Sequence, residues 1–322
     1  PHLSWPLRFV LPHDSHLRPA WMIRAGLFLY DHLATRRTLP ASRKIDLRKH
    51  PAGRSLNPRY RTAFEYSDGW VDDARLVVAN AVDAFERGAE VLTRTACVRL
   101  QRDSMEWIAT LRTADGRERT LRTRIVVNAA GPWGARLTQT VAEVDIPVEN
   151  SRHQVAVFQR PENLAEPQHP FIGDFIQGFY IRPETGLLTL AGSLEASEAA
   201  NKVDPDHFSE SVDMDFNIDM AERTEHRVPA MCDAQIRKGW AGLYDVTPDW
   251  HPIIGRIPGA DGLICAFGFS GSGFKMAPVI GEMIADLATG DQQCPIDSHP
   301  FRLERFAEGD LVVGRYAYSI IG

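Results

Sequence analysis

The chain has 322 residues, 44% of them hydrophobic and 24% charged, which is ordinary for a globular protein of one or two domains. No apolar run approaches the roughly 20 residues that span a bilayer, and no signal peptide is visible. The four cysteines are widely spaced without a Cys-x-x-Cys pair, so a zinc site and a disulfide framework are not expected. The expected location is a reducing cytoplasm.

Charge is unevenly distributed along the chain. The first 60 residues contain 11 Lys/Arg and 3 Asp/Glu, a net charge of +8, whereas the whole chain carries −6. The remaining residues therefore carry −14. A basic segment is attracted to an anionic leaflet, so peripheral contact with the inner face of a membrane is predicted as the alternative to a purely cytoplasmic location. No nucleic-acid partner is expected.

The first third of the chain predicts two helices. Residues 1–19 are rich in Pro and His and are expected to be extended or looped, and residues 36–61 are expected to be a basic loop. Pro19 opens a helical pattern that continues to Leu33. Residues 71–87 form an amphipathic helical pattern, with Asp72 and Asp73 suited to its start and Gly88 to its end.

The rest of the chain alternates strands and helices. Expected strands are residues 90–93, 96–102, 107–112 and 122–128, with Asp115-Gly116 as a hairpin turn and a helix after Ala129-Ala130-Gly131. Beyond Val148 the expected strands are residues 154–158, 178–182 and 187–191, followed by a polar helical stretch from about Pro205 to Arg227. An apolar strand at 262–267 and a helix at 274–287 complete a pattern typical of mixed α/β folds with a second, antiparallel layer.

The most informative local feature is the glycine-rich segment GFSGSGFK, residues 268–275, between that last strand and helix. Glycines allow backbone N–H groups to approach a ligand, and a helix N-terminus carries partial positive charge. The segment therefore predicts a site for an electron-rich group. The alternative is a plain turn that needs positive φ angles.

Two longer motifs carry a family resemblance. GWAGLYDVTPDWHPIIG at residues 239–255 and ICAFGFSGSGFKMAPVIGEMIADL at residues 264–287 resemble the sarcosine oxidase and dimethylglycine dehydrogenase-like members of the D-amino-acid oxidase superfamily, and the resemblance covers residues 134–309. PHLSWPLRFVLPH, RPAWMIRAGLFLYDHL and FEYSDGWVDDARLVVANAVDAFERGAEVLTRT resemble aerobic glycerol-3-phosphate dehydrogenases over residues 1–133. RIVVNAAGPWGARL is shared by both branches. The chain therefore reads as a hybrid of two related families.

The resemblance implies a fold and a cofactor. The expected fold is mixed α/β: a Rossmann-like FAD-binding domain without its N-terminal βαβ unit, because no G-x-G-x-x-G motif is present, and an antiparallel-sheet substrate domain. The expected domains are residues 1–147 for the FAD-binding domain, 148–240 for the substrate domain, and 241–322 for the return to the FAD-binding domain and the tail. FAD is expected to bind noncovalently, because Gly242 occupies the position of the cysteine that tethers flavin in monomeric sarcosine oxidases.

The resemblance also implies site residues. On the substrate side these are Tyr244, Lys275 and Arg182. Cofactor contacts are expected from Val98, Ala130, Gly131, Trp133, Gly242, Gly268, Gly271, Ser272, Gly273, Phe274 and Lys275. For several of them a structural role stays open: Lys275 as a solvated lysine, Tyr244 as a core tyrosine, and Arg182 as a surface salt bridge. His153 and His251 are single histidines, for which a structural role is expected over that of a base or metal ligand.

Tyr244 decides the expected substrate. It stands where glycine oxidases, D-amino-acid oxidases and glycerol-phosphate enzymes have an anion-gripping arginine, and a tyrosine cannot bind carboxylate or phosphate bidentately. The expected reaction is oxidation of the C–N bond of a small secondary or N-methyl amino acid, such as sarcosine, by hydride transfer to flavin. The alternatives are quinone-linked oxidation of glycerol 3-phosphate, and a non-catalytic fragment or assembly subunit. The electron acceptor is oxygen, a quinone or an electron-transfer protein.

Overall fold

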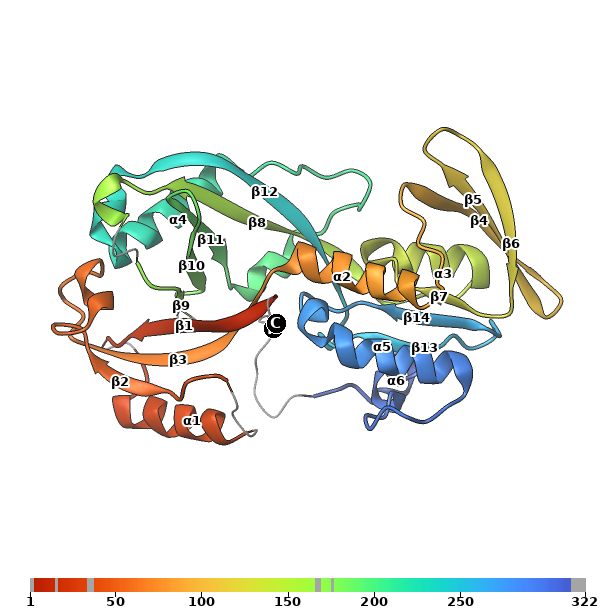
Figure 1. Cartoon of the computed structure of the whole chain (residues 1–322), viewed down its shortest axis with the longest axis horizontal. Helices are drawn as coiled ribbons and strands as arrows, with labels where there is room; N and C mark the ends of the chain where they lie inside the picture. Colours follow the sequence, from red (N-terminus) through yellow and green to blue (C-terminus); the bar gives the residue numbers. More distant parts are fainter. Residues whose placement is uncertain (1–2, 15–16, 34–37, 166–168, 175–176, 314–322) are drawn as a thin grey trace. The chain divides into compact units, whose positions relative to one another are not determined.

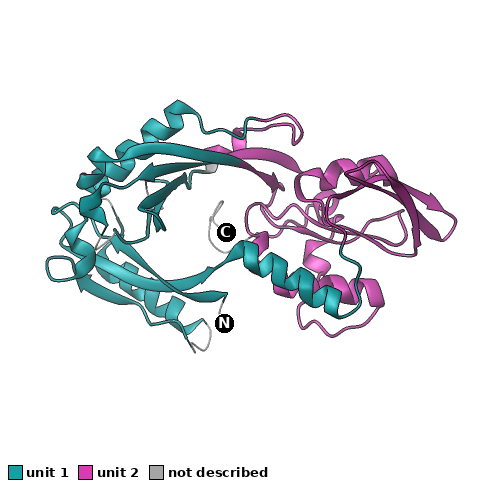
Figure 2. Ribbon diagram, turned by 45° about the horizontal axis from the view of Figure 1, so that its top comes forward, with its two compact units in different colours: residues 1–91, 154–195, 209–241 teal, residues 92–153, 196–208, 242–322 magenta. Residues whose placement is uncertain are grey.

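The computed structural model describes residues 3–14, 17–33, 38–165, 169–174 and 177–313, which form a mixed α/β fold with four sheets (Figure 1). The predicted fold class is confirmed. The chain divides into two compact units (Figure 2). Unit 1 comprises residues 1–91, 154–195 and 209–241, and unit 2 comprises residues 92–153, 196–208 and 242–322. The assignment of sequence segments to FAD-binding and substrate domains stays a prediction.

Unit 1 contains an antiparallel sheet in the order β1-β3-β2, formed by β1 (Ser4–Pro12), β3 (Thr62–Val71) and β2 (Arg43–Asp46). A five-stranded sheet has the order β12 (Gln235–Val246), β8 (Glu149–Gln159), β11 (Leu188–Ser193), β10 (Phe179–Glu184) and β9 (Ile172–Asp174). Strands β8 and β12 continue into unit 2. The helices of unit 1 are α1 (Ala20–His32), α2 (Asp73–Glu86) and α4 (Met214–Arg227).

The core of unit 1 joins these elements. Ala63 of β3, Phe179 and Ile181 of β10, and Met220 of α4 are fully buried in one apolar cluster. Beside it the fully buried Arg227 forms an ion pair with Asp174 and a hydrogen bond with Tyr60. Because a lone buried charge is very costly, this pairing is what allows an arginine inside the unit.

Unit 2 contains an antiparallel sheet of β4 (Thr95–Asp103), β5 (Glu106–Thr113) and β6 (Glu118–Thr123). A second sheet has the order β13 (Ile253–Arg256), β14 (Leu263–Phe267) and β7 (Val126–Asn128), with β14 and β7 parallel. Its helices are α3 (Gly134–Ala142), α5 (Gly273–Thr289) and α6 (Arg305–Glu308). Short 3-10 helices of both units are Pro51–Arg54, Gly131–Trp133, Glu162–Leu164, Ala196–Ala200, Pro229–Asp233 and His299–Phe301.

The core of unit 2 is centred on β14, whose five residues are all buried. Phe267 packs with Trp107 of β5 and Ile253 of β13, so this core links both sheets of the unit. A continuous apolar run predicts a strand covered on both faces, and β14 behaves accordingly. Its carboxyl end leads directly into the glycine-rich segment.

The helices predicted at residues 19–33, 71–87 and 274–287 are confirmed. Helix α1 begins after Pro19, and α2 begins at its N-cap Asp72, which accepts a hydrogen bond from the backbone N–H of Arg75 (3.2 Å). Helix α5 ends at Gly290, which adopts the left-handed conformation. The Asp115-Gly116 turn also joins β5 to β6 as predicted.

Four sequence predictions were wrong. Residues 90–93 form no strand, and β4 begins only at Thr95. In the described part of the expected 36–61 loop, Arg43–Asp46 pair with β3 and residues 51–54 form a 3-10 helix. The expected strand 122–128 is divided between β6 and β7, because the chain leaves an antiparallel partner for a parallel one. The helical stretch expected from about Pro205 to Arg227 begins only at Met214, since Asp213 is its N-cap.

No helix in the described part of the chain is long and apolar enough to cross a membrane. Within the same residues, no group of three or more His, Cys, Asp or Glu side chains is placed to hold a metal ion.

Candidate functional site

The site is built around the turn between β14 and α5. The end of strand β12 holds this turn: the N–H of Gly268 donates to the Asp245 carboxylate (2.6 Å), and the N–H of Ser270 donates to the Asp245 carbonyl (3.1 Å). Thr247 adds a hydrogen bond from its N–H to the Ser270 hydroxyl (3.3 Å). Burial raises the pKa of Asp245, against the effect of the Gly268 N–H. The turn is therefore fixed by buried groups of the neighbouring strand.

Gly271 places the backbone of the turn against an aromatic ring. Its φ angle is +86°, and a Cβ atom there would lie 2.5 Å from Cε2 of Tyr244. Both facts require glycine, because L residues rarely adopt this conformation and the ring leaves no room for a side chain. The predicted residues Gly268, Gly271 and Tyr244 thus meet in one structure.

The first turn of α5 has no side-chain cap and no acidic residue. Its N-cap, Ser272, donates its hydroxyl to the Phe269 carbonyl (2.7 Å) and does not cap the helix. No acidic residue lies in this first turn, where Phe274 and Lys275 are both exposed. A lysine at a helix N-terminus adds to the positive end of the dipole instead of opposing it. This arrangement suits an electron-rich or anionic group.

Tyr244 is held from a second direction by His153 of β8. The two rings stack with centroids 3.8 Å apart and an interplanar angle of 23°. Ser151, on the same face of β8, forms a hydrogen bond with Nε2 of His153 (2.9 Å). Burial raises the pKa of Tyr244 and lowers the pKa of His153 to about 4, so both rings are uncharged at neutral pH. The Tyr244 hydroxyl has no hydrogen-bond partner among the described residues.

Two predicted glycines border open space. A Cβ atom at Gly242 of β12, or at Gly131 before α3, would meet no atom within 4 Å. Next to Gly131, the exposed Trp133 donates its indole N–H to Asp206 (2.7 Å), and Arg136 is paired with the same carboxylate. The Trp133 indole is therefore oriented but leaves its ring accessible.

Three further predicted residues are Ala130, Val98 and Arg182. The Ala130 N–H donates a hydrogen bond to the side-chain oxygen of Asn128 (3.2 Å), which shapes the end of β7. Val98 is exposed at a bulge in β4. Arg182 belongs to unit 1, where it forms an ion pair with Glu184 (2.9 Å). Their roles toward a ligand stay predictions.

Sequence reasoning underrated His153 and overlooked Asp245. Asp245 follows Tyr244 directly, and the alternation of β12 turns it toward the opposite face, where it holds the turn. His153 could be found only through the pairing of β8 with β12, which no local pattern reveals. His251, in contrast, is structural: its ring bonds the Asp249 carbonyl (2.6 Å), and its own carbonyl accepts from the fully buried Arg305 (2.8 Å).

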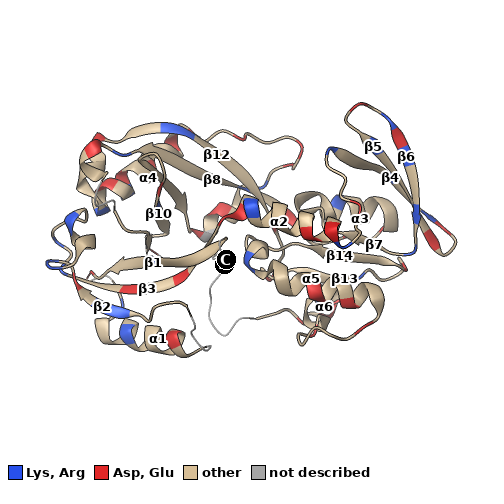
Figure 3. Cartoon of the chain, viewed as in Figure 1, with Lys and Arg blue, Asp and Glu red and all other residues tan. Residues whose placement is uncertain are grey.

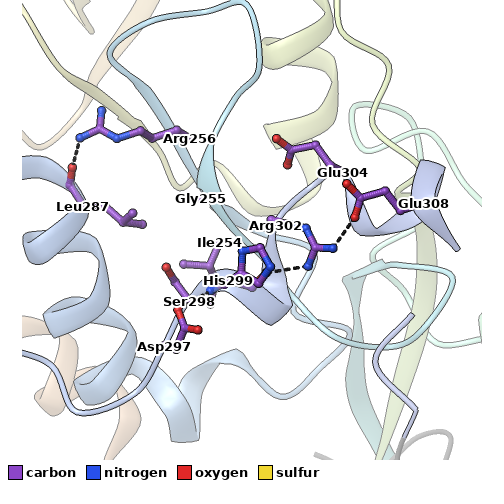
Figure 4. A pocket seen from close by; sticks show the side chains of 10 residues that line it. All are labelled: Ile254, Gly255, Arg256, Leu287, Asp297, Ser298, His299, Arg302, Glu304 and Glu308. Carbon is purple, nitrogen blue, oxygen red and sulfur yellow. Dashed lines mark hydrogen bonds and ion pairs between the residues drawn. The ribbon is translucent and has the colours of Figure 1, made fainter. Parts of the chain in front are cut away.

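A hollow of about 450 Å³ lies at the other end of α5 (Figure 4). Its two arginines are engaged, because Arg256 donates to the Leu287 carbonyl and Arg302 pairs with Glu308. Leu287 is near the C-terminus of a 17-residue helix, so the hollow lies roughly 20 Å along the helix from the glycine turn. It is separate from the candidate site.

Comparison with known proteins identifies the family. The model of the DAO family, described as FAD dependent oxidoreductase, matches residues 1–287. The chain belongs to this family. Glycerol-3-phosphate dehydrogenase of Pseudomonas aeruginosa is 56% identical over 139 residues, which are 43% of this chain and 27% of that protein. Monomeric sarcosine oxidase of a Bacillus species is 27% identical over 246 residues, 74% of this chain and 61% of that protein.

A solved structure extends the similarity over most of the chain. L-proline dehydrogenase from P. horikoshii has a TM-score of 0.73 and 26% identity, and the match covers 96% of this chain and 78% of that chain. The two resemblances predicted from sequence are thus confirmed, whereas the position of the change near Trp133 stays a prediction. The chain spans 26 to 28% of the length of the curated relatives that it matches at 49 to 56% identity.

The residues present fit the flavin that defines the DAO family. A flavin ring needs backbone approach at its polar edge, space for its plane, and positive potential where reduction adds negative charge. The glycine turn allows the backbone approach, and the open space at Gly242 leaves room for the ring plane. The start of α5, which has no side-chain cap, and Lys275 provide the positive potential. Gly242 offers no thiol for a covalent bond, which fits noncovalent FAD.

Proposed function

We propose that this DAO-family chain serves FAD-dependent oxidation of the C–N bond of a small secondary or N-methyl amino acid. The observation that carries the proposal is the state of Tyr244: an uncharged phenol, fixed against the glycine turn, with a hydroxyl that has no partner among the described residues. One hydroxyl suits a ligand that needs a single hydrogen bond. It cannot replace the cations that usually bind a phosphate.

The proposed role of each group in the reaction follows from these contacts. Bound FAD supplies the hydride acceptor. The start of α5 and Lys275 stabilise negative charge near the turn, and Gly271 allows the backbone to come close. Tyr244 orients the amine or carboxyl group of the substrate by hydrogen bonding, so that its C–H bond is held for transfer. Arg182 is the proposed carboxylate partner, for which it would have to exchange its bond with Glu184.

Two alternatives have support of their own. Similarity to glycerol-3-phosphate dehydrogenase at 56% identity favours a polyol phosphate as substrate, with a quinone as acceptor. The match covers only 27% of the length of that glycerol-3-phosphate dehydrogenase, which favours a chain that is not catalytic by itself. We place the amine first because the L-proline dehydrogenase match covers 96% of this chain, and proline is a secondary amine. Oxygen, a quinone and an electron-transfer protein all stay open as acceptors.

An anaerobic reduction experiment tests the substrate. Purified full chain with FAD is mixed separately with sarcosine, dimethylglycine, L-proline and glycerol 3-phosphate, and bleaching of the visible flavin bands is followed. We expect bleaching by one or more of the amines at a rate above that for glycerol 3-phosphate. Faster bleaching by glycerol 3-phosphate would promote the polyol-phosphate alternative. A flavin-loaded chain that none of the four reduces would favour the non-catalytic one.

We also propose that the protein works at the surface of an anionic membrane, on the inner face, through α1. The polar side chains of this helix face the protein, which is the reverse of the usual arrangement of a surface helix. Arg24 donates to the Ser42 hydroxyl (3.0 Å), Asp31 accepts from the Ser42 N–H (2.9 Å), and Tyr30 donates to the Ser67 carbonyl (3.0 Å). Arg24 and Asp31 are also the only charged residues of α1 (Figure 3).

The outward face of α1 is apolar. Its exposed large side chains are Trp21 (70%), Met22 (39%), Phe28 (53%) and Leu29 (64%), with Leu33 at the C-cap. An apolar helix face with an aromatic residue at its end is typical of interfacial helices, and the +8 charge of residues 1–60 complements an anionic leaflet.

Sedimentation with vesicles tests this location. The full chain is mixed with phosphatidylserine-containing or neutral vesicles at low and high salt. We expect binding to the anionic vesicles that weakens with salt, and at least a tenfold weaker binding for F28S/L29S, since each side chain contributes roughly 1.5–3 kcal/mol when buried. The matched control is V77S/V78S on α2, whose valines are equally exposed. Equal binding by both double variants, or none by the wild type, would contradict the proposal.

A further inference from the structure

His153 stacks face to face on Tyr244, an arrangement that a histidine would not need if it only filled the core. The Tyr244 ring is held on one side by the imidazole, at 3.8 Å between centroids, and is contacted by Gly271 of the turn. Three separate segments of unit 2 thus meet at one ring: the start of β8, the end of β12 and the glycine turn. The ring cannot turn about its χ1 bond without moving one of these neighbours.

The imidazole is itself fixed. Ser151 and His153 are two residues apart on β8, so their side chains lie on the same face of the strand, and the Ser151 hydroxyl bonds Nε2 of His153 (2.9 Å). Ser151 is almost fully buried, and the backbone at Ser151 pairs with Lys202. The support for the Tyr244 ring therefore extends back into buried backbone.

Both rings are kept neutral by their surroundings. Burial lowers the pKa of His153 to about 4 and raises the pKa of Tyr244. Two neutral rings can stack closely, whereas an imidazolium would carry a charge into a partly buried site. The Tyr244 hydroxyl has no hydrogen-bond partner among the described residues, although the ring that carries it is held by the stack and the turn.

We propose that His153 is a positioning residue, which holds Tyr244 against the glycine turn so that the Tyr244 hydroxyl is presented to the substrate. This inference rests on the proposed function. It adds that the site selects its substrate through one rigid, neutral hydrogen-bonding group, and that the rigidity comes from a histidine and a serine of β8. Displacement of a reacting group by about 1 Å can cost on the order of a hundredfold in rate, so loss of the stack should matter to kcat.

The first test compares two replacements in the FAD-loaded full chain. His153→Ala removes the stack and should lower kcat/KM for the preferred amine on the order of 10- to 100-fold, mainly in kcat, with flavin content unchanged. His153→Phe keeps an aromatic ring on Tyr244 and should restore activity to within about threefold of wild type. His207→Ala, at an exposed histidine of unit 2, is the matched control. Equal losses for the alanine and phenylalanine variants, or a loss of flavin with activity, would overturn the positioning role.

The second test does not depend on turnover. In the chain with selectively labelled histidines, the ring-proton signals of His153, assigned by their absence in His153→Phe, should be shifted upfield by the Tyr244 ring relative to those of His207. In Tyr244→Leu this shift should disappear. A wild-type His153 signal at the ordinary position would overturn the proposal. If the shift is present but no amine is oxidised, the proposed function fails while the stack stands, so the two failures are distinguishable.

Discussion

Replacement of Gly271 by alanine measures how tightly the turn contacts Tyr244. The substitution has two costs. An L residue at φ +86° costs roughly 1–2 kcal/mol. A Cβ atom 2.5 Å from Cε2 of Tyr244 must also displace the ring, and overpacking of this kind costs about 1–3 kcal/mol. We expect a total loss of about 2–5 kcal/mol in the free energy of unfolding, from these two estimates.

Gly290 provides a matched control, because its φ angle is +85° and a Cβ atom there would meet nothing within 4 Å. Urea unfolding followed by far-UV circular dichroism should give a loss of only about 1–2 kcal/mol for Gly290→Ala. In a Tyr244→Ala background, Gly271→Ala should cost no more than Gly290→Ala, since the contact is gone. Equal losses for the two single alanine variants would refute the packing of Tyr244 on the turn.

Two further predictions concern stability. Burial lowers the pKa of His169 to about 4, so between pH 6.5 and 4 the unfolded chain binds a proton that the folded chain does not. The free energy of unfolding should therefore fall by at most about 3 kcal/mol as the pH drops from 6.5 to 4. In urea unfolding at several pH values, His169→Gln should flatten the dependence of stability on pH over this range. Asp249→Asn leaves the fully buried Arg305 without its carboxylate partner and should cost about 3–5 kcal/mol, whereas the control Asp261→Asn, at an exposed side chain, should cost under about 0.5 kcal/mol by thermal unfolding. A steeper curve for His169→Gln, or a loss under about 1 kcal/mol for Asp249→Asn, would contradict them.

Helix ends and the glycine turn could be predicted from sequence because their causes are local. Asp72 caps α2, Gly88 follows α2 in the left-handed conformation, and Pro19 precedes α1, each within a few residues of the helix that it bounds. The turn at residues 268–275 was found for the same reason. Its glycines report a backbone requirement that no other residue meets.

Strand β3 shows where local signals fail. Its polar residues Glu65 and Ser67 alternate with apolar ones, a pattern that suggests a solvent face, yet both are buried because Arg8 and Arg43 of the neighbouring strands pair with Glu65. The arrangement of the site residues is hard to predict from local sequence for the same reason. Tyr244 could be chosen by resemblance, but its stacking on His153 depends on β8 lying beside β12, a pairing of segments about 90 residues apart that no local sequence pattern encodes.

The central claim, that the glycine turn and the end of β12 form the FAD site, is tested most directly at Gly242. A Cβ atom at this position would meet no protein atom within 4 Å, so we expect Gly242→Leu to leave the melting temperature unchanged or raise it, because leucine suits a strand better than glycine. The open space is where we place the flavin. We predict that the purified wild-type chain carries FAD that acid precipitation releases, and that the variant folds with a small fraction of that flavin. A wild type that binds no FAD, or a Gly242→Leu variant with the full complement, would contradict the account.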